Sequence, residues 1–165
     1  MSCGLIDGVL AKSGMVEPGD TQALRDDFSF AVYAAANAMS RACKSELEAF
    51  GLTYPQYLVL LALWERDGRM VREIAEALFL DAATVTPILK RLEAGGLVTR
   101  LRSADDERRL SVRLTEQGRD LQARMAHVPA LVREATGLEN TELKILLDQL
   151  RRLREGMVSG AKAQV

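Results

Sequence analysis

The chain has 165 residues, of which 48% are hydrophobic and 27% charged, and a formal net charge of −1. These values are typical of one globular domain and exclude a disordered or collagen-like chain. The longest apolar runs, residues 30–36 and 57–64, are far shorter than the roughly 20 residues of a membrane-spanning helix. Because the start also lacks the basic and apolar regions of a signal peptide, we expect a cytoplasmic protein that does not enter the membrane.

Cysteine and histidine are too scarce for most enzyme and metal chemistry. The chain has two cysteines, Cys3 and Cys43, and one histidine, His127. They do not have the spacing of a zinc site, a catalytic triad would depend on His127 alone, and the glycines are not arranged as a phosphate loop. We therefore expect no catalytic residue, metal or cofactor, and we expect His127 at the surface or in an interface.

The predicted elements begin after a flexible arm over residues 1–21, which holds four glycines and shows little periodicity. From residue 22 to residue 50, apolar residues recur every three or four positions and predict a helix that Gly51 ends. A second helix over about 55–66 is apolar nearly all round, so we expect it to be buried. The apolar stripe of the first helix consists of Val32, Ala36, Met39, Cys43, Leu47 and Phe50.

A helix-turn-helix is predicted next. Residues 70–78 have the pattern of an amphipathic helix, residues 79–81 are too few for anything but a tight turn, and residues 82–94 are helical again. Two short helices joined by such a turn have the spacing of a helix-turn-helix. Residues 97–102 and 110–114 then alternate apolar and polar side chains, which predicts a β-hairpin with a charged tip.

These elements predict a winged helix: a mainly α fold with a small β-hairpin wing, here called the winged-helix lobe (51–114). Thr115 caps a further helix over about 116–135, and a last helix covers about 139–157. The first and the last two helices carry more apolar surface than one compact lobe can cover. Either a partner subunit covers them or they fold back on their own lobe; on the first interpretation, residues 22–50 and 115–160 form a dimerisation region.

Charge is segregated along the chain. Residues 1–27 hold two cations against five acids, whereas residues 86–113 hold seven cations against four acids. A local basic cluster in a nearly neutral chain is a modest indication of nucleic-acid binding. A solvated charged face would produce the same pattern.

Between residues 52 and 118 the sequence resembles the MarR family of winged-helix transcription regulators, and most closely its organic-hydroperoxide-resistance (OhrR) branch. The resemblance implies a symmetric dimer, most often a repressor, that grips palindromic double-stranded DNA with half-sites roughly 34 Å apart. The segments that carry it are LTYPQY (52–57), LDAATVTPILKRLE (80–93), GLVTR (96–100), DDERR (105–109) and LTEQG (114–118).

The second helix of the helix-turn-helix carries candidate DNA contacts. If Val85, Ile88 and Leu92 face the core, small and hydroxylated residues lead its outward face. A threonine hydroxyl can bond to bases, a threonine methyl or a proline ring can touch a thymine methyl, and lysine or arginine suits phosphate. The candidate contacts are Ala83, Thr84, Thr86, Pro87, Lys90 and Arg91.

Pro87 breaks a local rule if Asp81 caps this helix, because a proline past the first turn removes a hydrogen bond. Either Thr84 is the effective cap or the first turn is irregular. A helix start is the plain interpretation of the proline.

In the wing, Arg108 follows three acids. We expect Asp106 to brace Arg108 through a charge-assisted bond, and Arg108 to enter a narrow, A·T-rich minor groove. The Asp-x-Arg wing motif of the family matches residues 106–108; a solvated turn is the alternative. Arg100 and Arg102 contact the DNA backbone or pair with acids.

The resemblance also implies a sensor pocket. Members of the OhrR branch carry a reactive cysteine near the start of the first helix, a few residues before a tyrosine. Here that position is Ser29, four residues before Tyr33, and serine cannot form a sulfenic acid or a disulfide. Cys43 stands where the branch usually has a tyrosine that faces the reactive cysteine across the dimer, and Cys3 is a bystander or a resolving thiol.

Cys43 has two interpretations. Its neighbours Arg41 and Lys44 favour a reactive thiolate, whereas its place in the apolar stripe favours an inert core residue. Tyr54 and Tyr57 are further pocket candidates from the resemblance, or else core aromatics.

The leading function is therefore a dimeric regulator that an organic hydroperoxide or another oxidant releases from DNA. The alternative is a regulator released by a small aromatic ligand without thiol chemistry. A winged helix that binds only proteins would not need Arg108, Thr84 or Lys90, and an enzyme is excluded by the single histidine.

Overall fold

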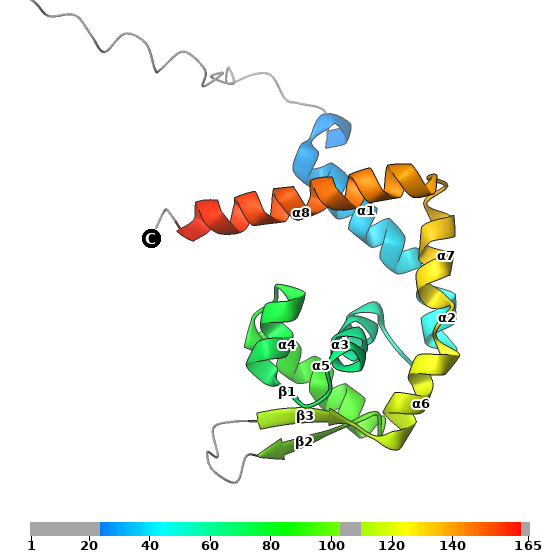
Figure 1. The fold of residues 1–165 in the computed structure, drawn as a ribbon, viewed down its shortest axis with the longest axis vertical. Coiled ribbons are helices and arrows are strands. Elements are labelled where there is room, and N and C mark those ends of the chain that lie inside the picture. The colour runs from blue at the N-terminus through cyan, green and yellow to red at the C-terminus, as the bar shows by residue number, and fades with distance from the viewer. Residues whose placement is uncertain (1–23, 103–109, 163–165) are drawn as a thin grey trace, which may run out of the picture. The chain divides into compact units, whose positions relative to one another are not determined.

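The structure, a computed structural model, describes residues 24–102 and 110–162. Within these ranges no helix is long and apolar enough to cross a membrane. The elements in chain order are the 3-10 helix η1 (Leu24–Asp26), α1 (Phe28–Ala42), α2 (Lys44–Glu48), α3 (Tyr54–Glu65), β1 (Arg69–Met70), α4 (Val71–Leu78), α5 (Ala82–Ala94), β2 (Val98–Arg102), β3 (Leu110–Leu114), α6 (Glu116–Arg124), α7 (Val128–Ala135) and α8 (Asn140–Lys162) (Figure 1).

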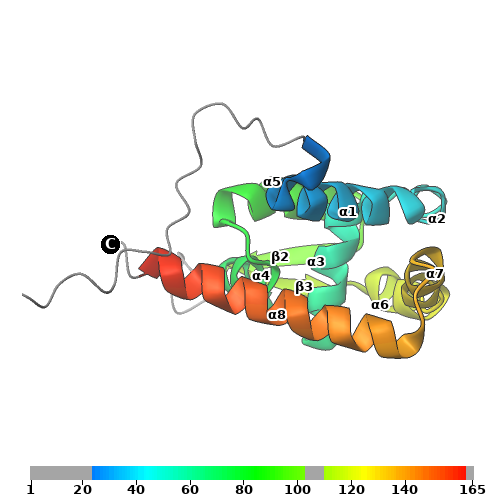
Figure 2. The ribbon, with the colours of Figure 1, turned by 90° about the horizontal axis from the view of Figure 1, so that it is seen from above.

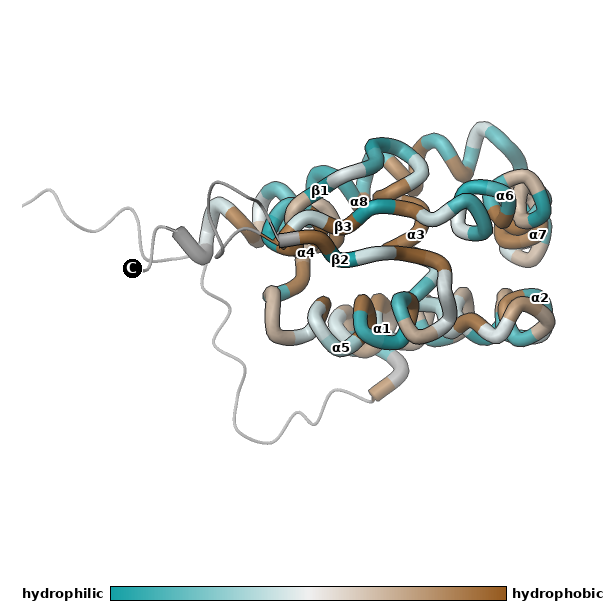
Figure 3. The backbone as a smooth tube through the Cα atoms, turned by 90° about the horizontal axis from the view of Figure 1, so that it is seen from below, coloured by the Kyte–Doolittle hydropathy of each residue, from teal (hydrophilic) through white to brown (hydrophobic). Residues whose placement is uncertain are grey.

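Helix α3 lies in the middle of the core, as its apolar composition predicts. Its first turn is held by a capping box in which the backbone N–H of Thr53 donates to Oε1 of Gln56 at 2.7 Å. Val59, Leu60 and Leu63 have no exposed surface, and the middle of the helix is strongly hydrophobic (Figure 3). Burying each such side chain contributes about 1.5–3 kcal/mol.

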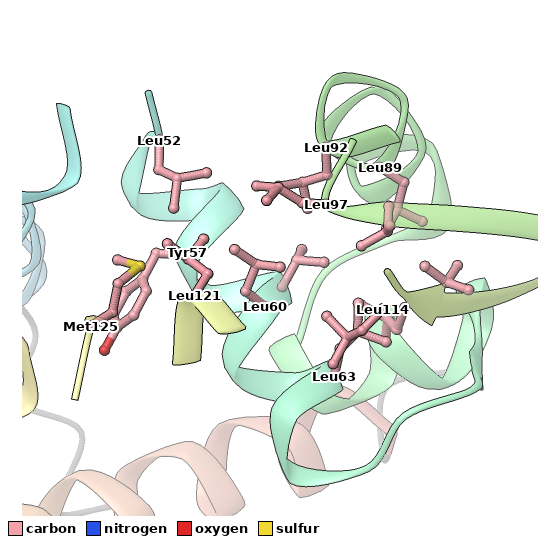
Figure 4. Close-up of a cluster of buried hydrophobic side chains, with 14 of the residues drawn as sticks. Leu52, Tyr57, Leu60, Leu63, Leu89, Leu92, Leu97, Leu114, Leu121 and Met125 are labelled. Carbon is pink, nitrogen blue, oxygen red and sulfur yellow. The ribbon is translucent and has the colours of Figure 1, made fainter. Parts of the chain in front are cut away.

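Leucines from α5 and the wing close around this helix. Figure 4 shows Leu89 and Leu92 of α5 near Leu60 of α3, with Leu114 of β3 beside Leu63. The buried cluster also includes a leucine in the second half of α6 and two residues that follow this helix. Its members are Cys43, Leu47, Leu52, Tyr57, Val59, Leu60, Leu63, Ile74, Ala75, Val85, Leu89, Leu92, Leu97, Val98, Val112, Leu114, Leu121, Met125 and Val128.

The wing is an antiparallel sheet with the strand order β1-β3-β2. The predicted hairpin is present: β2 and β3 run side by side (Figure 2), with Val98 opposite Leu114. The sequence did not predict β1, which pairs Arg69 with Val112. The carboxylate of Asp67 accepts hydrogen bonds from the N–H groups of Gly68 and Leu114, both at 2.8 Å, and so anchors the end of β3.

Two predicted helices are each broken in the structure. The prediction of one helix over 116–135 is wrong, because α6 ends at Arg124 and α7 begins at Val128. Pro129 lies in the first turn of α7, where its missing N–H is tolerated. The described part of the predicted helix over 22–50 comprises η1, α1 and α2, with Cys43 between the last two. His127, which precedes α7, lies 3.0 Å from the Glu46 carboxylate.

Candidate nucleic-acid interface

The turn of the helix-turn-helix has the predicted length, residues 79–81. Phe79 ends α4 in the left-handed conformation, with φ at 55°, which costs a residue with a Cβ atom about 1–2 kcal/mol. The N–H of Leu80 returns to the carbonyl of Ala75 at 2.9 Å and closes the end of α4. The guanidinium of Arg154, from α8, lies over the exposed Phe79 ring, 4.7 Å from its centre.

Asp81 is the cap of α5, the second helix of the helix-turn-helix. Its Oδ1 accepts the backbone N–H of Thr84 at 2.6 Å, and its Oδ2 accepts the Thr84 hydroxyl at 3.0 Å. The hydrogen bond from the Thr84 N–H makes the largest contribution to lowering the pKa of Asp81, and the bond from the Thr84 hydroxyl lowers it further. The alternative that Thr84 is the effective cap is therefore wrong.

Pro87 lies inside α5 and does not start it. With no N–H on the proline, the carbonyl of Ala83 loses its helical donor. One residue earlier, the Thr86 hydroxyl donates to the carbonyl of Ala82 at 2.6 Å. Pro87 is exposed, so its ring belongs to the outward face of the helix.

The inward face of α5 consists of Val85, Leu89 and Leu92, each at most 1% exposed. Leu89 takes the inward place that the sequence had suggested for Ile88, which is only half-buried. Thr86 is half-buried as well. The exposed candidate contacts are Ala83, Thr84, Pro87, Lys90 and Arg91, so small residues lead the face and two cations follow in the next turns.

Arg100 of β2 forms an ion pair with Glu93 at the end of α5. Its Nε donates to Glu93 Oε2 at 2.8 Å, its Nη2 donates to the same oxygen, and its backbone N–H donates to Oε1 at 3.1 Å. The Arg100 hydrogen bonds hold the pKa of Glu93 below its usual range. Of the two expectations for Arg100, pairing with an acid is the one that the structure contains. The side chain of Arg102 and the wing-tip residues Asp106 and Arg108 lie outside the described residues.

The predicted sensor residues at the start of α1 are exposed. The Ser29 hydroxyl donates to the carboxylate of Asp27, which also accepts the N–H of Phe30 at 2.7 Å. The hydrogen bond from the Ser29 hydroxyl makes the largest contribution to lowering the pKa of Asp27, and the bond from the Phe30 N–H lowers it further. Ser29 thus takes part in capping α1, and Tyr33 is 66% exposed.

Cys43 lies in the core with no exposed surface, and burial raises the pKa of its thiol. Burial also raises the pKa of Tyr54 and of Tyr57, and the electrostatic effect of Cys43 raises both pKa values further. The Tyr54 hydroxyl contacts the sulfur of Met39 at 3.7 Å. Because the thiolate is the reactive form of cysteine, this environment disfavours reactivity.

Sequence reasoning missed the role of Glu93 and part of the role of Asp81 in this site. Glu93 had no assigned partner, because only the fold brings it to Arg100. Asp81 was considered only as a cap, although it also binds the Thr84 hydroxyl. Its position three residues before a threonine was the available signal.

Comparison with known proteins adds three findings. A family model of the SarA/Rot transcriptional regulators matches residues 41–125. The chain is 49% identical to the HTH-type transcriptional regulator TtmR of Methylorubrum extorquens (strain PA1), over 90% of this chain and 77% of TtmR. It is 38% identical to the organic hydroperoxide resistance transcriptional regulator of Bacillus subtilis (strain 168), over 82% of this chain and 92% of that protein.

Among solved structures, reduced AbfR of Staphylococcus epidermidis bound to DNA superposes with a TM-score of 0.69. The two sequences are 32% identical, and the match covers 82% of this chain and 94% of AbfR.

Proposed function

The chain belongs to the MarR family of winged-helix transcription regulators, and on that basis we propose that it is a cytoplasmic homodimer that represses transcription by binding a palindromic, A·T-rich operator. Its relatives are transcription regulators, so it is a regulator and not an enzyme. The observation that carries the proposal is the outward face of α5.

On this proposal α5 enters the major groove. Ala83, Thr84, Thr86 and Pro87 lead the helix and are small enough for close approach to base edges. Lys90 and Arg91 follow and neutralise phosphates, which contributes affinity and not sequence information.

The wing acts beside α5. Arg108, braced by Asp106, enters the minor groove next to the site that α5 reads. Arg100 does not need to touch DNA, because its pairing with Glu93 already holds β2 against the end of α5.

Helix α8 supports the homodimer. Six large apolar side chains on it are between 39% and 67% exposed, and exposed apolar surface of this kind marks interaction sites. A second copy of the chain would cover them, and two-fold symmetry would place two α5 helices on successive turns of DNA. The six are Ile145, Leu146, Leu147, Leu150, Met157 and Val158.

For the signal that releases DNA, two observations argue against thiol oxidation, which leaves the small aromatic ligand as the proposed signal. Ser29 cannot be oxidised to a sulfenic acid, and Cys43 is buried with a raised thiol pKa. A ligand acts by favouring one spacing of the two lobes over another by several kcal/mol.

Fluorescence anisotropy with an A·T-rich palindromic duplex tests DNA binding. We expect salt-dependent binding that Arg108→Ala weakens, while Lys144→Ala, an exposed cation on α8, serves as the control. Each of Lys90→Ala and Arg91→Ala should reduce the salt slope by about one. Unchanged binding in Arg108→Ala would contradict the role of the wing.

A further inference from the structure

We infer that Thr84 and Thr86 read bases as hydrogen-bond acceptors, and therefore select A·T pairs at the positions they contact in the major groove. The inference rests on the proposed function, because it concerns how α5 reads DNA. It states that each threonine hydroxyl accepts a hydrogen bond from a base, whereas a threonine by its type alone could donate or accept.

The Thr84 hydroxyl is committed to Asp81. The two oxygens, Thr84 Oγ1 and Asp81 Oδ2, are 3.0 Å apart. An ionised carboxylate can only accept hydrogen bonds, so the hydrogen between them must belong to Thr84. Asp81 stays ionised because the Thr84 N–H bonds to its other oxygen at 2.6 Å.

The Thr86 hydroxyl is committed to the backbone. Its Oγ1 lies 2.6 Å from the carbonyl oxygen of Ala82, and a carbonyl oxygen can only accept. A hydroxyl has one hydrogen and two lone pairs. Toward a ligand, both threonines therefore offer lone pairs and a methyl group.

The remaining side chains of the first two turns of α5, residues 82–87, add no donor. Ala82 and Ala83 are apolar, Pro87 carries only its ring, and Val85 is buried. The first cationic donors on the outward face are Lys90 and Arg91. The side chains at the leading end of the helix thus present acceptors and methyl groups together.

This combination matches an A·T pair. In the major groove, hydrogen-bond donors occur only on the amino groups of adenine and cytosine, and guanine presents only acceptors. An A·T pair offers the adenine amino group and the thymine methyl in the same groove, with the thymine O4 acceptor between them, whereas a G·C pair offers the cytosine amino group and no methyl. The expected order of contacted bases is adenine, then cytosine, with guanine last.

The test begins with selection of preferred duplexes from a random pool by the full-length protein. Thr84→Val and Thr86→Val keep the shape of each side chain and remove its hydroxyl, so the position at which each variant loses its preference identifies the base that the threonine contacts. At that position, adenine is replaced by purine, which lacks the 6-amino group, and separately by 7-deazaadenine, which lacks the N7 acceptor.

We expect removal of the amino group to weaken binding by wild-type protein roughly 3- to 10-fold, the effect of one net hydrogen bond, and loss of N7 to change it by less than about 2-fold. The opposite pattern would show that the hydroxyls donate to N7 and would overturn the inference. So would a preferred guanine at these positions, or no base preference tied to either threonine.

Asp81→Asn should reverse the direction of the hydrogen bond between residue 81 and the Thr84 hydroxyl. The asparagine oxygen still caps the helix, since asparagine and aspartate are equivalent caps, while its amide group donates to Thr84 Oγ1 and frees the Thr84 hydrogen. At the DNA position that Thr84 contacts, the base preference should then shift toward bases that present acceptors. At the position that Thr86 contacts, the base preference should not change, which provides an internal control. The lost negative charge raises affinity for all sequences alike.

The outcomes separate the two proposals. If no duplex is enriched over the random pool, the proposed function fails. If a palindrome is enriched but the base analogues and Asp81→Asn give the wrong pattern, DNA binding stands and only the acceptor inference fails.

Discussion

The indole nitrogen of Trp64 donates a hydrogen bond to the carbonyl oxygen of Gly118 at 2.9 Å, and so ties the end of α3 to the first turn of α6. Gly118 also lies close to the backbone of Leu97. A Cβ atom added at Gly118 would lie 2.1 Å from the carbonyl oxygen of Leu97, which precedes β2. The glycine thus lets α6 pack against the base of the wing.

Gly118→Ala should therefore destabilise the protein toward the upper end of the roughly 1–3 kcal/mol seen for overpacked sites, measured by urea unfolding. Gly95→Ala is the control, because its Cβ would meet backbone oxygens only at 3.5 Å or more. Equal effects of the two substitutions would contradict the close approach.

Glu93 should contribute stability that depends on pH. Its pKa is lowered in the folded protein, so its contribution is present above the ordinary value of 4.5 and is lost as the pH falls through the lowered value. Glu93→Gln should reduce the free energy of unfolding by up to about 1 kcal/mol at pH 7, and the difference from wild type should shrink toward pH 3. A constant difference across urea titrations from pH 7 to pH 3 would rule out the ion pair as its source.

Thiol oxidation should leave DNA binding intact. We expect wild-type protein and Cys43→Ser to keep their operator affinity after treatment with an organic hydroperoxide, measured by anisotropy, because Cys43 is buried. Ser29→Cys should gain a response, since residue 29 is exposed. Release of DNA by oxidised wild type that disappears in Cys43→Ser would show instead that Cys43 senses the oxidant.

A charge on the apolar face of α8 should break the proposed homodimer. Leu150 is 44% exposed in the single chain, so Leu150→Glu removes little core packing, yet it would place an unpaired carboxylate in the interface. We expect monomers in sedimentation equilibrium and weaker operator binding. Arg151→Glu adds a carboxylate at the adjacent exposed residue and should remain dimeric; an unchanged dimer in Leu150→Glu would argue against this interface.

The sequence predicted best the helices that turn residues follow directly. Helices over about 55–66 and 82–94 were expected, and α3 and α5 lie within one residue of those bounds, because Asp67-Gly68 follows the first and Gly95-Gly96 the second. The break between α6 and α7 was missed because apolar residues continue through Met125 and Val128, both of which are buried. β1 has only two residues, too few for any alternation to be visible.

For the site, the sequence identified which residues α5 presents but not what holds them. Thr84 and Thr86 were chosen for their type, whereas the direction of their hydrogen bonds depends on Asp81 and on a backbone carbonyl. Arg100 was assigned to the interface without its partner, since Glu93 comes close only when β2 packs beside α5. Such pairings depend on the fold and cannot be predicted from the spacing of residues in the sequence.

The left-handed Phe79 has a consequence for how the protein can move. Glycine would occupy that backbone conformation without strain, but it would leave Arg154 with no ring to lie over. The aromatic side chain therefore provides a contact between the turn of the helix-turn-helix and the last helix. Any rearrangement that shifts α8 against α4 must either break this cation–π contact or carry the start of the recognition helix along with it.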